Sequence, residues 1–165
     1  MPETLEPDAR QLLEDANFCY IATVGKDGRP QVNPIWVDVE GDEVLVNSED
    51  GRSWPNNLRR DPQVTLCVPE KDNPYHYVTI WGRVVEDTQE GAFEHIDELA
   101  KTYLDKDKYP NNEPGDVRVI FRIEVEKVKL YGESARARTG VNRATELSEG
   151  VTGETVGDTE SLSSS

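Results

Sequence analysis

Alternation of apolar and polar residues runs through most of the chain and predicts antiparallel strands. Asp27 and Gly28 form the pair that a two-residue hairpin prefers between the first two strands. Pro34 cannot donate to a ladder, so we expect the second strand to be irregular or at a sheet edge there. Gly82 indicates a bulge or a close backbone approach within the fifth strand. Six strands are expected, at residues 18–24, 30–39, 43–48, 63–69, 75–86 and 117–131.

Helical spacing of apolar residues is found in two segments. Residues 5–16 carry a short amphipathic pattern, and residues 90–104 carry a clearer one in which Ile96, Leu99 and Tyr103 share a face. We expect the second helix to cap an opening of a barrel. Mostly sequential strands flanked by two helices predict a mainly β protein, with a closed or nearly closed antiparallel barrel.

The composition changes in the last fifth of the chain. Ser, Thr, Gly and Glu dominate there, and such a segment cannot bury enough apolar surface to offset its ordering entropy. We therefore predict one domain over residues 1–132 and a polar, flexible tail over residues 133–165. Arg136, Arg138 and Arg143 could close over a phosphate ligand, but a flexible tail whose arginines balance nearby acids is favoured.

The net charge of the chain limits the classes of partner that it can bind. The 165 residues include 33 acidic and 18 basic ones, for a formal net charge of −15. This excludes a broad surface for nucleic acid or anionic membranes, and it fits either a salt-adapted or simply an acidic cytosolic protein. Cys19 and Cys67 lie in apolar strand-like segments and are expected to be buried, unpaired thiols. The sequence shows no signal-peptide pattern and no apolar run of spanning length, so we expect a soluble, cytoplasmic protein.

One polar, cationic stretch lies between two strand-like runs, at residues 47–64. Arg52, Arg59 and Arg60 concentrate there in an otherwise acidic chain, so a phosphate-bearing ligand would dock there more readily than elsewhere. The alternative is a solvated loop that leads into a short helical turn.

Neither histidine of the chain predicts catalysis. His76 stands at the start of a strand and His95 on the polar side of a helix, and neither has a partner at triad or metal spacing. We therefore expect both to be structural. We also expect no catalytic side chain and no metal site.

Several short motifs, taken in order and spacing, resemble the pyridoxamine 5′-phosphate oxidase-like split barrels. Within that superfamily they are most similar to the branch that uses the deazaflavin F420 or FMN. The motifs are YIATV at 20–24, DGRP at 27–30, NPIWV at 33–37, VNS at 46–48, GR at 51–52 and NLRRDPQV at 57–64. The resemblance covers about residues 16–131. It implies a six-stranded antiparallel split β-barrel of the FMN-binding type, and a homodimer with cofactor sites at the subunit interface.

The resemblance also implies a site and an activity. The cofactor ring would lie against the second and third strands, and its phosphate would be held by the following loop. The implied activity is hydride transfer between reduced F420 and a small conjugated or heteroaromatic molecule. Alternatives are an FMN-dependent oxidase-like enzyme, a flavin- or haem-like ligand-binding barrel without turnover, and a purely structural dimer. The candidate cofactor contacts are Asn33, Pro34, Ile35, Trp36, Asn47, Ser48, Arg52, Trp54 and Asn57.

One departure from the family pattern concerns the phosphate. Members of the branch commonly carry cations where this chain has Trp54 and Asn56, and their loss weakens charge-assisted phosphate binding. Trp54 could stack on a ring or plug the loop, and the plug is slightly favoured. Arg59, Arg60 or the tail arginines could compensate for the missing charge.

Overall fold

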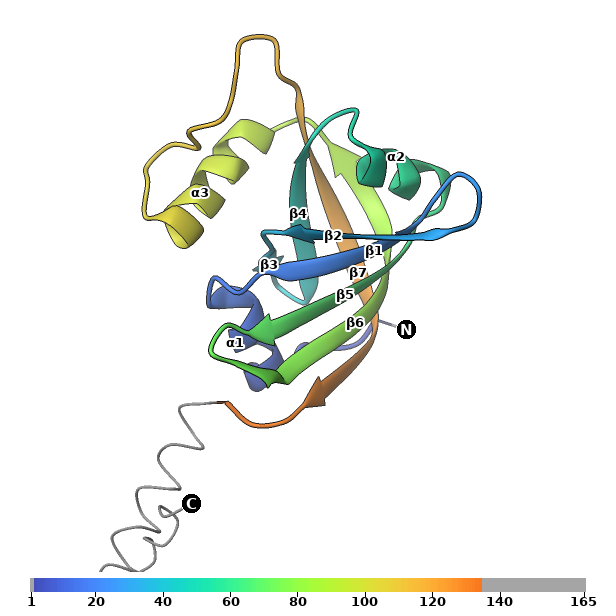
Figure 1. Cartoon of the computed structure of the whole chain (residues 1–165), viewed down its shortest axis with the longest axis vertical. Coiled ribbons are helices and arrows are strands. Elements are labelled where there is room, and N and C mark those ends of the chain that lie inside the picture. The colour runs from blue at the N-terminus through green and yellow to red at the C-terminus, as the bar shows by residue number, and fades with distance from the viewer. Residues whose placement is uncertain (1, 135–165) are drawn as a thin grey trace, which may run out of the picture. The chain divides into compact units, whose positions relative to one another are not determined.

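The structure, a computed structural model, describes residues 2–134. Within this range the chain forms one antiparallel sheet of seven strands with three helices around it (Figure 1). The strand order is β2-β1-β5-β6-β7-β4-β3. The predicted tail at 133–165 lies almost wholly outside the described residues. The elements are α1 (Pro7–Glu14), β1 (Cys19–Val24), β2 (Pro30–Ile35), β3 (Asp38–Glu40), β4 (Glu43–Glu49), α2 (Ser53–Arg60), β5 (Gln63–Glu70), β6 (Asn73–Thr88), α3 (Ala92–Leu104) and β7 (Arg118–Tyr131).

The expected second strand, residues 30–39, is in fact two strands, so the count of six is wrong. β2 pairs with β1 and β3 pairs with β4, with a break at Trp36 and Val37. The chain turns there because one strand cannot follow both neighbours across a curled sheet. As a result β2 and β3 are the two ends of the strand order, and the sheet is not a closed barrel. The expected edge position near Pro34 is confirmed, and β2 pairs with β1 there without a register shift.

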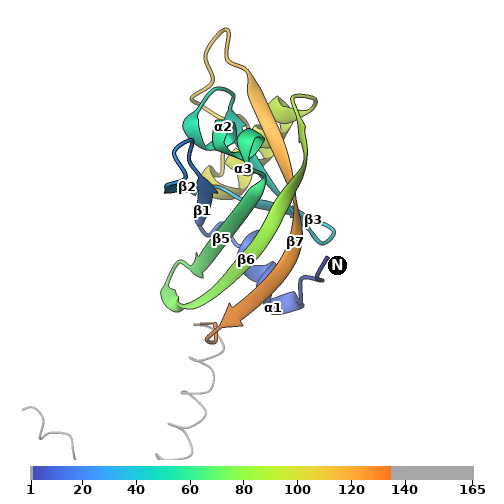
Figure 2. The same cartoon turned by 90° about the vertical axis from the view of Figure 1, so that its right-hand side faces the viewer.

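Two glycines shape the sheet, although the two-residue turn expected at Asp27 and Gly28 is wrong, because residues 25–29 join β1 to β2. Gly28 in the first hairpin has a φ of 83°, in the left-handed region that glycine favours. A Cβ on Gly82 would lie 2.5 Å from the carbonyl oxygen of Glu124, so only glycine fits there. The pairing of β6 with β7 shifts register beside it, between Trp81 and Gly82. Figure 2 shows these two strands running long and curved along one side.

The core lies between the curled sheet and helices α1 and α2. Its fully buried side chains come from almost every strand, which explains why the alternating pattern located the strands well. Cys19 is buried and Cys67 is half-buried, and both are free thiols. Burial raises the pKa of the Cys19 thiol far above its usual range. The largest fully buried side chains are Phe121, Leu13, Ile21, Leu66, Ile80 and Ile123.

Two helices flank the strands whose ends form the candidate site. α2 occupies most of the expected arginine loop, so the helical alternative for that stretch is confirmed. α3 contacts β4 and β7 and buries Ile96 and Leu99, as its periodicity predicts (Figure 1). Within residues 2–134, no helix has the length and apolar character that a membrane crossing requires.

Candidate functional site

A cavity of about 210 Å³ lies where the ends of β2 and β4 meet α2 and α3. It opens at the surface, where Pro34 and Arg52 are exposed. Eight of the nine candidates predicted from the sequence line this cavity: Asn33, Pro34, Ile35, Trp36, Asn47, Ser48, Arg52 and Trp54. Sequence reasoning missed five further lining residues: Phe18, Glu49, Ile96, Tyr109 and Arg118.

The ninth candidate, Asn57, lies elsewhere. Its side-chain nitrogen donates to Thr23 Oγ1 at 2.9 Å and to Gln31 Oε1 at 3.0 Å, and its oxygen accepts from Arg60 at 2.8 Å. Asn57 and Arg60 line a separate cavity beside the β1–β2 hairpin. The buried Asn57 therefore ties α2 to the sheet, and it does not meet the other eight candidates.

The three arginines of the expected anion loop do not converge. Arg52 reaches Glu49 at 3.3 Å and is largely exposed, while Arg59 binds Asp50 at 2.6 Å and Asp87 at 3.3 Å. Because α2 is helical, these side chains project in different directions. Of the three, only Arg52 lines the cavity, so Arg59 does not compensate there for the missing cations.

An aromatic wall closes one side of the cavity. The rings of Trp36 and Tyr103 stack with centroids 5.0 Å apart, and Tyr109 meets Trp36 edge-on at 5.8 Å. The hydroxyl of Tyr103 donates to the carbonyl oxygen of Asn17 at 2.7 Å and accepts from the backbone nitrogen of Val37 at 3.1 Å. Burial raises the pKa of Tyr103, so this hydroxyl stays protonated. Tyr103 of α3 therefore holds both residues of the break between β2 and β3 and the segment before β1.

Asn47 is the centre of a buried polar network on another side. Its Oδ1 accepts from Arg118 Nε at 2.8 Å, and its Nδ2 donates to the carbonyl oxygen of Ala92 at 2.9 Å. The same nitrogen lies 3.1 Å from His95 Nδ1, which must therefore accept. His95 Nε2 then carries the proton and donates to Asp38 Oδ2 at 3.0 Å. The network fixes the orientation of the Asn47 amide and the tautomer of His95.

His95 is thus placed differently from the sequence-based expectation. It is buried, at 6% exposure, and is not on the polar side of α3. Its two partners are 48 and 57 residues away in the sequence, so no local spacing could reveal them. Among the described residues no group of three or more His, Cys, Asp or Glu could hold a metal ion.

Trp54 packs into the core, as the plug interpretation expects. It is 5% exposed, and its ring lies 6.0 Å from that of Phe121. Trp54 also lines the cavity. Its position in the first turn of α2 makes it part of the floor beneath the site.

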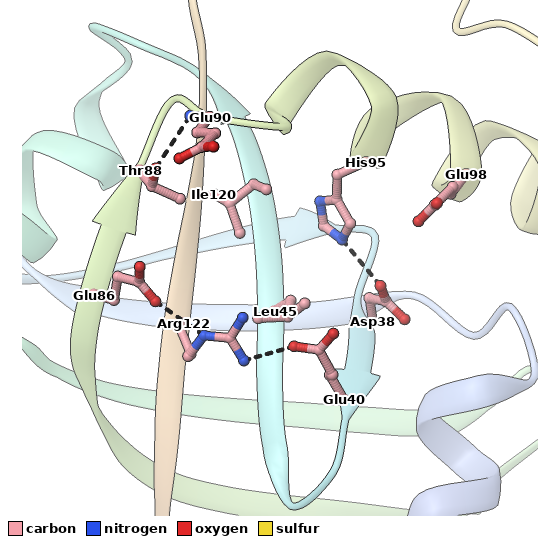
Figure 3. Close-up of a pocket in the computed structure, with 10 residues that line it drawn as sticks. All are labelled: Asp38, Glu40, Leu45, Glu86, Thr88, Glu90, His95, Glu98, Ile120 and Arg122. Carbon is pink, nitrogen blue, oxygen red and sulfur yellow. Dashed lines mark hydrogen bonds and ion pairs between the residues drawn. The ribbon is translucent and has the colours of Figure 1, made fainter.

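A second cavity, of about 230 Å³, lies on the other side of His95 (Figure 3). Carboxylates from β3, β6 and α3 surround it, and Arg122 from β7 reaches into it. Arg122 pairs with Glu40 at 2.8 Å and with Glu43 and Glu86 at 3.1 Å. These hydrogen bonds, the one from Glu40 first, raise the pKa of Arg122. Its positive charge is therefore paired with carboxylates of the protein itself.

Comparisons with known proteins agree with this geometry. A solved F420 reductase has a TM-score of 0.65 and 28% identity, covering 78% of this chain and 98% of that one. An FMN-binding protein from Syntrophomonas wolfei subsp. wolfei has a TM-score of 0.59 and 18% identity, covering 79% and 88%. A conserved hypothetical protein from Mycobacterium tuberculosis has a TM-score of 0.60 and 20% identity, covering 79% and 86%. No curated protein sequence matches the chain.

A family model described as pyridoxamine 5′-phosphate oxidase matches residues 5–132, which is nearly the whole described part of the chain. The mainly β architecture, the flanking helices and the cavity at the ends of β2 and β4 all lie within this match. The chain therefore belongs to the pyridoxamine 5′-phosphate oxidase family, with the split-barrel type of fold.

Proposed function

We propose that this chain is an F420-dependent oxidoreductase that transfers a hydride between the reduced deazaflavin and a small conjugated or heteroaromatic substrate. One observation carries the proposal. Seven residues that the family resemblance assigns to the cofactor, together with the candidate Trp54, come from separate segments of the chain and line one cavity. The similarity to an F420 reductase over 98% of that chain supports F420 ahead of FMN.

The residues around the cavity fit a flat, conjugated, anionic cofactor. Trp36, Pro34 and Ile35 supply apolar surface, and Trp36 is held in place by Tyr103. Asn33 and Ser48 supply polar groups at the same opening. Arg52 and Arg118 supply positive charge at a site in an otherwise acidic chain. The pocket thus combines apolar and aromatic surface for a ring with polar and cationic groups for an anionic chain.

The chain's own groups would bind, orient and shield, because the bound deazaflavin supplies the hydride. Trp36 cannot swing away without breaking its stack on Tyr103. Asn47 presents a fixed amide, since Arg118 and His95 hold its two ends. Phe18 and Pro34 at the rim exclude water from a ligand below them. None of the cavity's side chains is needed as a nucleophile in this scheme.

We further propose that the working form is a homodimer with the cofactor site at the interface. The cavity of about 210 Å³ is smaller than the roughly 300–1,000 Å³ of most ligand pockets, which fits half of a shared site. Three large apolar side chains are well exposed nearby. Phe18, just before β1, is 52% exposed, Tyr20 in β1 is 43% exposed, and Val32 in β2 is 61% exposed. A second copy that covered these side chains would remove apolar surface from water.

We place this activity in the cytoplasm. Cys19 and Cys67 are free thiols, as expected in a reducing compartment. Fractionation of the source cells, with the chain detected by an antibody, should recover it with the cytoplasmic proteins. Recovery with secreted proteins would contradict this part of the proposal.

The test is a titration of the purified protein with F420 and with FMN, at low and high salt, followed by cofactor fluorescence. We expect F420 to bind more tightly than FMN. Reduced F420 should then be oxidised in the presence of a conjugated acceptor only when the protein is present. Replacing Trp36 with leucine should weaken F420 binding, and the matched change Trp81→Leu, on a strand outside this cavity, should not.

Other outcomes would identify the alternatives. Tighter binding of FMN would favour an FMN-dependent enzyme. Retention of either cofactor without turnover of any acceptor would indicate a ligand-binding barrel. Binding of neither cofactor at either salt concentration would overturn the proposal and favour a structural dimer.

A further inference from the structure

Arg118 is the most unusual charged residue among those that the structure describes. It is 7% exposed and begins β7 at the wall of the candidate cofactor cavity. Its Nε donates to Asn47 Oδ1 at 2.8 Å and its Nη1 donates to Asn112 Oδ1 at 3.2 Å. Its guanidinium carbon lies 5.0 Å from the centre of the Tyr109 ring. All three partners are neutral, and within residues 2–134 the guanidinium makes no ion pair with a carboxylate.

Arg122 provides an internal comparison, because it lies two residues further along the same strand. It is half-buried and pairs with Glu40 and Glu86, as Figure 3 shows, and also with Glu43. Its charge is therefore balanced within the fold, whereas the more deeply buried charge of Arg118 is not. Glu49, the acid nearest to the cavity mouth, is paired with Arg52.

Burying an unpaired charge is costly, and a fold normally neutralises it or pairs it. Burial lowers the pKa of Arg118, and it outweighs the opposing influence of Tyr109 and Glu49. Arginine nevertheless keeps its charge at neutral pH, because its ordinary pKa lies so far above it. Glu49 and Asp116 act on this charge only from beyond ion-pair distance, and Arg118 lines the cavity, so a closer counter-charge can come from a ligand.

Resting on the function proposed above, we infer that Arg118 is the anion-binding residue of this cavity and pairs with a phosphate or carboxylate group of the bound molecule. Asn47 and Tyr109 hold the guanidinium by one edge and one face. That leaves N–H groups of the fork for an oxyanion. Arg118 thereby supplies the charge that Trp54 and Asn56 do not supply in the loop.

The anion could belong to the cofactor or to the substrate, and binding experiments separate the two. The probes are F420 against its phosphate-free deazaflavin chromophore, and FMN against riboflavin, which lacks only the phosphate. Inorganic phosphate and benzoate serve as small anions. Each is added to the ligand-free and to the cofactor-loaded protein, and the rise in melting temperature reports its binding.

The decisive variant is Arg118→Gln, which keeps an amide donor for Asn47 and removes the charge. Arg118→Lys keeps the positive charge but loses the planar set of N–H donors of the guanidinium. Arg122→Gln is the matched control on the same strand. If the anion is the cofactor phosphate, wild type and Arg122→Gln prefer the phosphorylated probes, and Arg118→Gln binds them about 10- to 100-fold more weakly while binding the phosphate-free ones normally. If the anion belongs to the substrate, Arg118→Gln should bind the cofactors normally. Phosphate and benzoate should then no longer raise its melting temperature.

A stability measurement guards against a merely structural role. Without ligand, Arg118→Gln should be at least as stable in urea as wild type, because an uncompensated buried charge has been removed. Arg122→Gln should be less stable than wild type. If F420 and FMN fail to bind but phosphate protects wild type and not Arg118→Gln, the proposed function fails and this inference stands. If no probe distinguishes Arg118→Gln from wild type, the inference is overturned.

Discussion

The side-chain nitrogen of Asn47 lies 3.1 Å from Nδ1 of His95, and this contact joins β4 to α3 beneath the cavity. The neighbouring hydrogen bond from His95 Nε2 to Asp38 extends the connection to β3. A helix that touches the sheet at few points thus gains a buried polar anchor. The geometry of the cavity wall depends on this anchor.

Replacing His95 with leucine should lower the free energy of unfolding by about 1–3 kcal/mol, because Asn47 loses an acceptor and Asp38 loses a donor. Urea unfolding followed by tryptophan fluorescence measures the change. Glu98→Gln, at an exposed position one turn along the same helix, should change the stability by less than about 0.5 kcal/mol. Equal stability of the two variants would show that the network is not formed.

The ion pair between Asp50 and Arg59 makes a pH-dependent contribution. The hydrogen bond from Arg59 lowers the pKa of Asp50 in the folded state below its usual value. The pair therefore stabilises the fold at and above neutral pH, and this stabilisation is lost as the pH falls through the lowered pKa. Asp50→Asn should cost roughly 1 kcal/mol or less at neutral pH, since the pair is partly exposed.

The difference between wild type and Asp50→Asn should shrink towards zero in acid. Urea midpoints measured at several pH values between neutrality and strong acid give the profile. Asp27→Asn serves as the control, because its only ion pair within the described residues is a 4.0 Å contact between two well-exposed groups. A constant difference at all pH values would contradict the assignment.

Removing the hydroxyl of Tyr103 should loosen the aromatic wall. Tyr103→Phe keeps the stack on Trp36 but leaves the carbonyl of Asn17 and the N–H of Val37 without this partner. We expect a loss of about 1–3 kcal/mol in unfolding free energy and weaker F420 binding. Tyr20→Phe, at a position that is 43% exposed, should leave the stability unchanged. Equal losses for both variants would argue against a specific role of the Tyr103 hydroxyl.

Substitutions of Trp54 distinguish a role in core packing from a role in stacking on the cofactor ring. Trp54→Ala should cost about 3–5 kcal/mol, because the side chain is buried against Phe121. Trp54→Phe should recover much of the stability and should leave F420 affinity within a few fold of wild type. If Trp54→Phe folds normally but loses the cofactor, Trp54 acts on the ligand and not as a plug.

Strands such as β5 were predictable because they bury one face, whereas β4 is buried at five consecutive residues. In β5, for example, Val64, Leu66 and Val68 point into the core while their neighbours do not, and the sequence alternates accordingly. The need for glycine at Gly28 was readable, but the length of the turn was not. The break after Ile35 was not readable, because it reflects which neighbour each half pairs with, β1 for β2 and β4 for β3, and not a change in the local pattern.

The cavity was predictable only in part, and for a similar reason. The family motifs lie on β2, on β4 and at the start of α2, and these segments do meet. Arg118 carried no motif. Its partner Asn47 is 71 residues away, and its burial cannot be read from the spacing within β7. A pairwise signal of that length is invisible to periodicity.

The two prolines of β2 also protect the molecule from associating in the wrong way. In a strand, every second residue points its backbone N–H to the same edge, so Pro30, Val32 and Pro34 share one edge. A proline ring fits where no ladder bond is donated, which makes this the outer edge. Only Val32 can then donate along it. A foreign strand cannot zip onto an edge with so few donors, so the rim of the cavity stays open to small molecules without seeding aggregation.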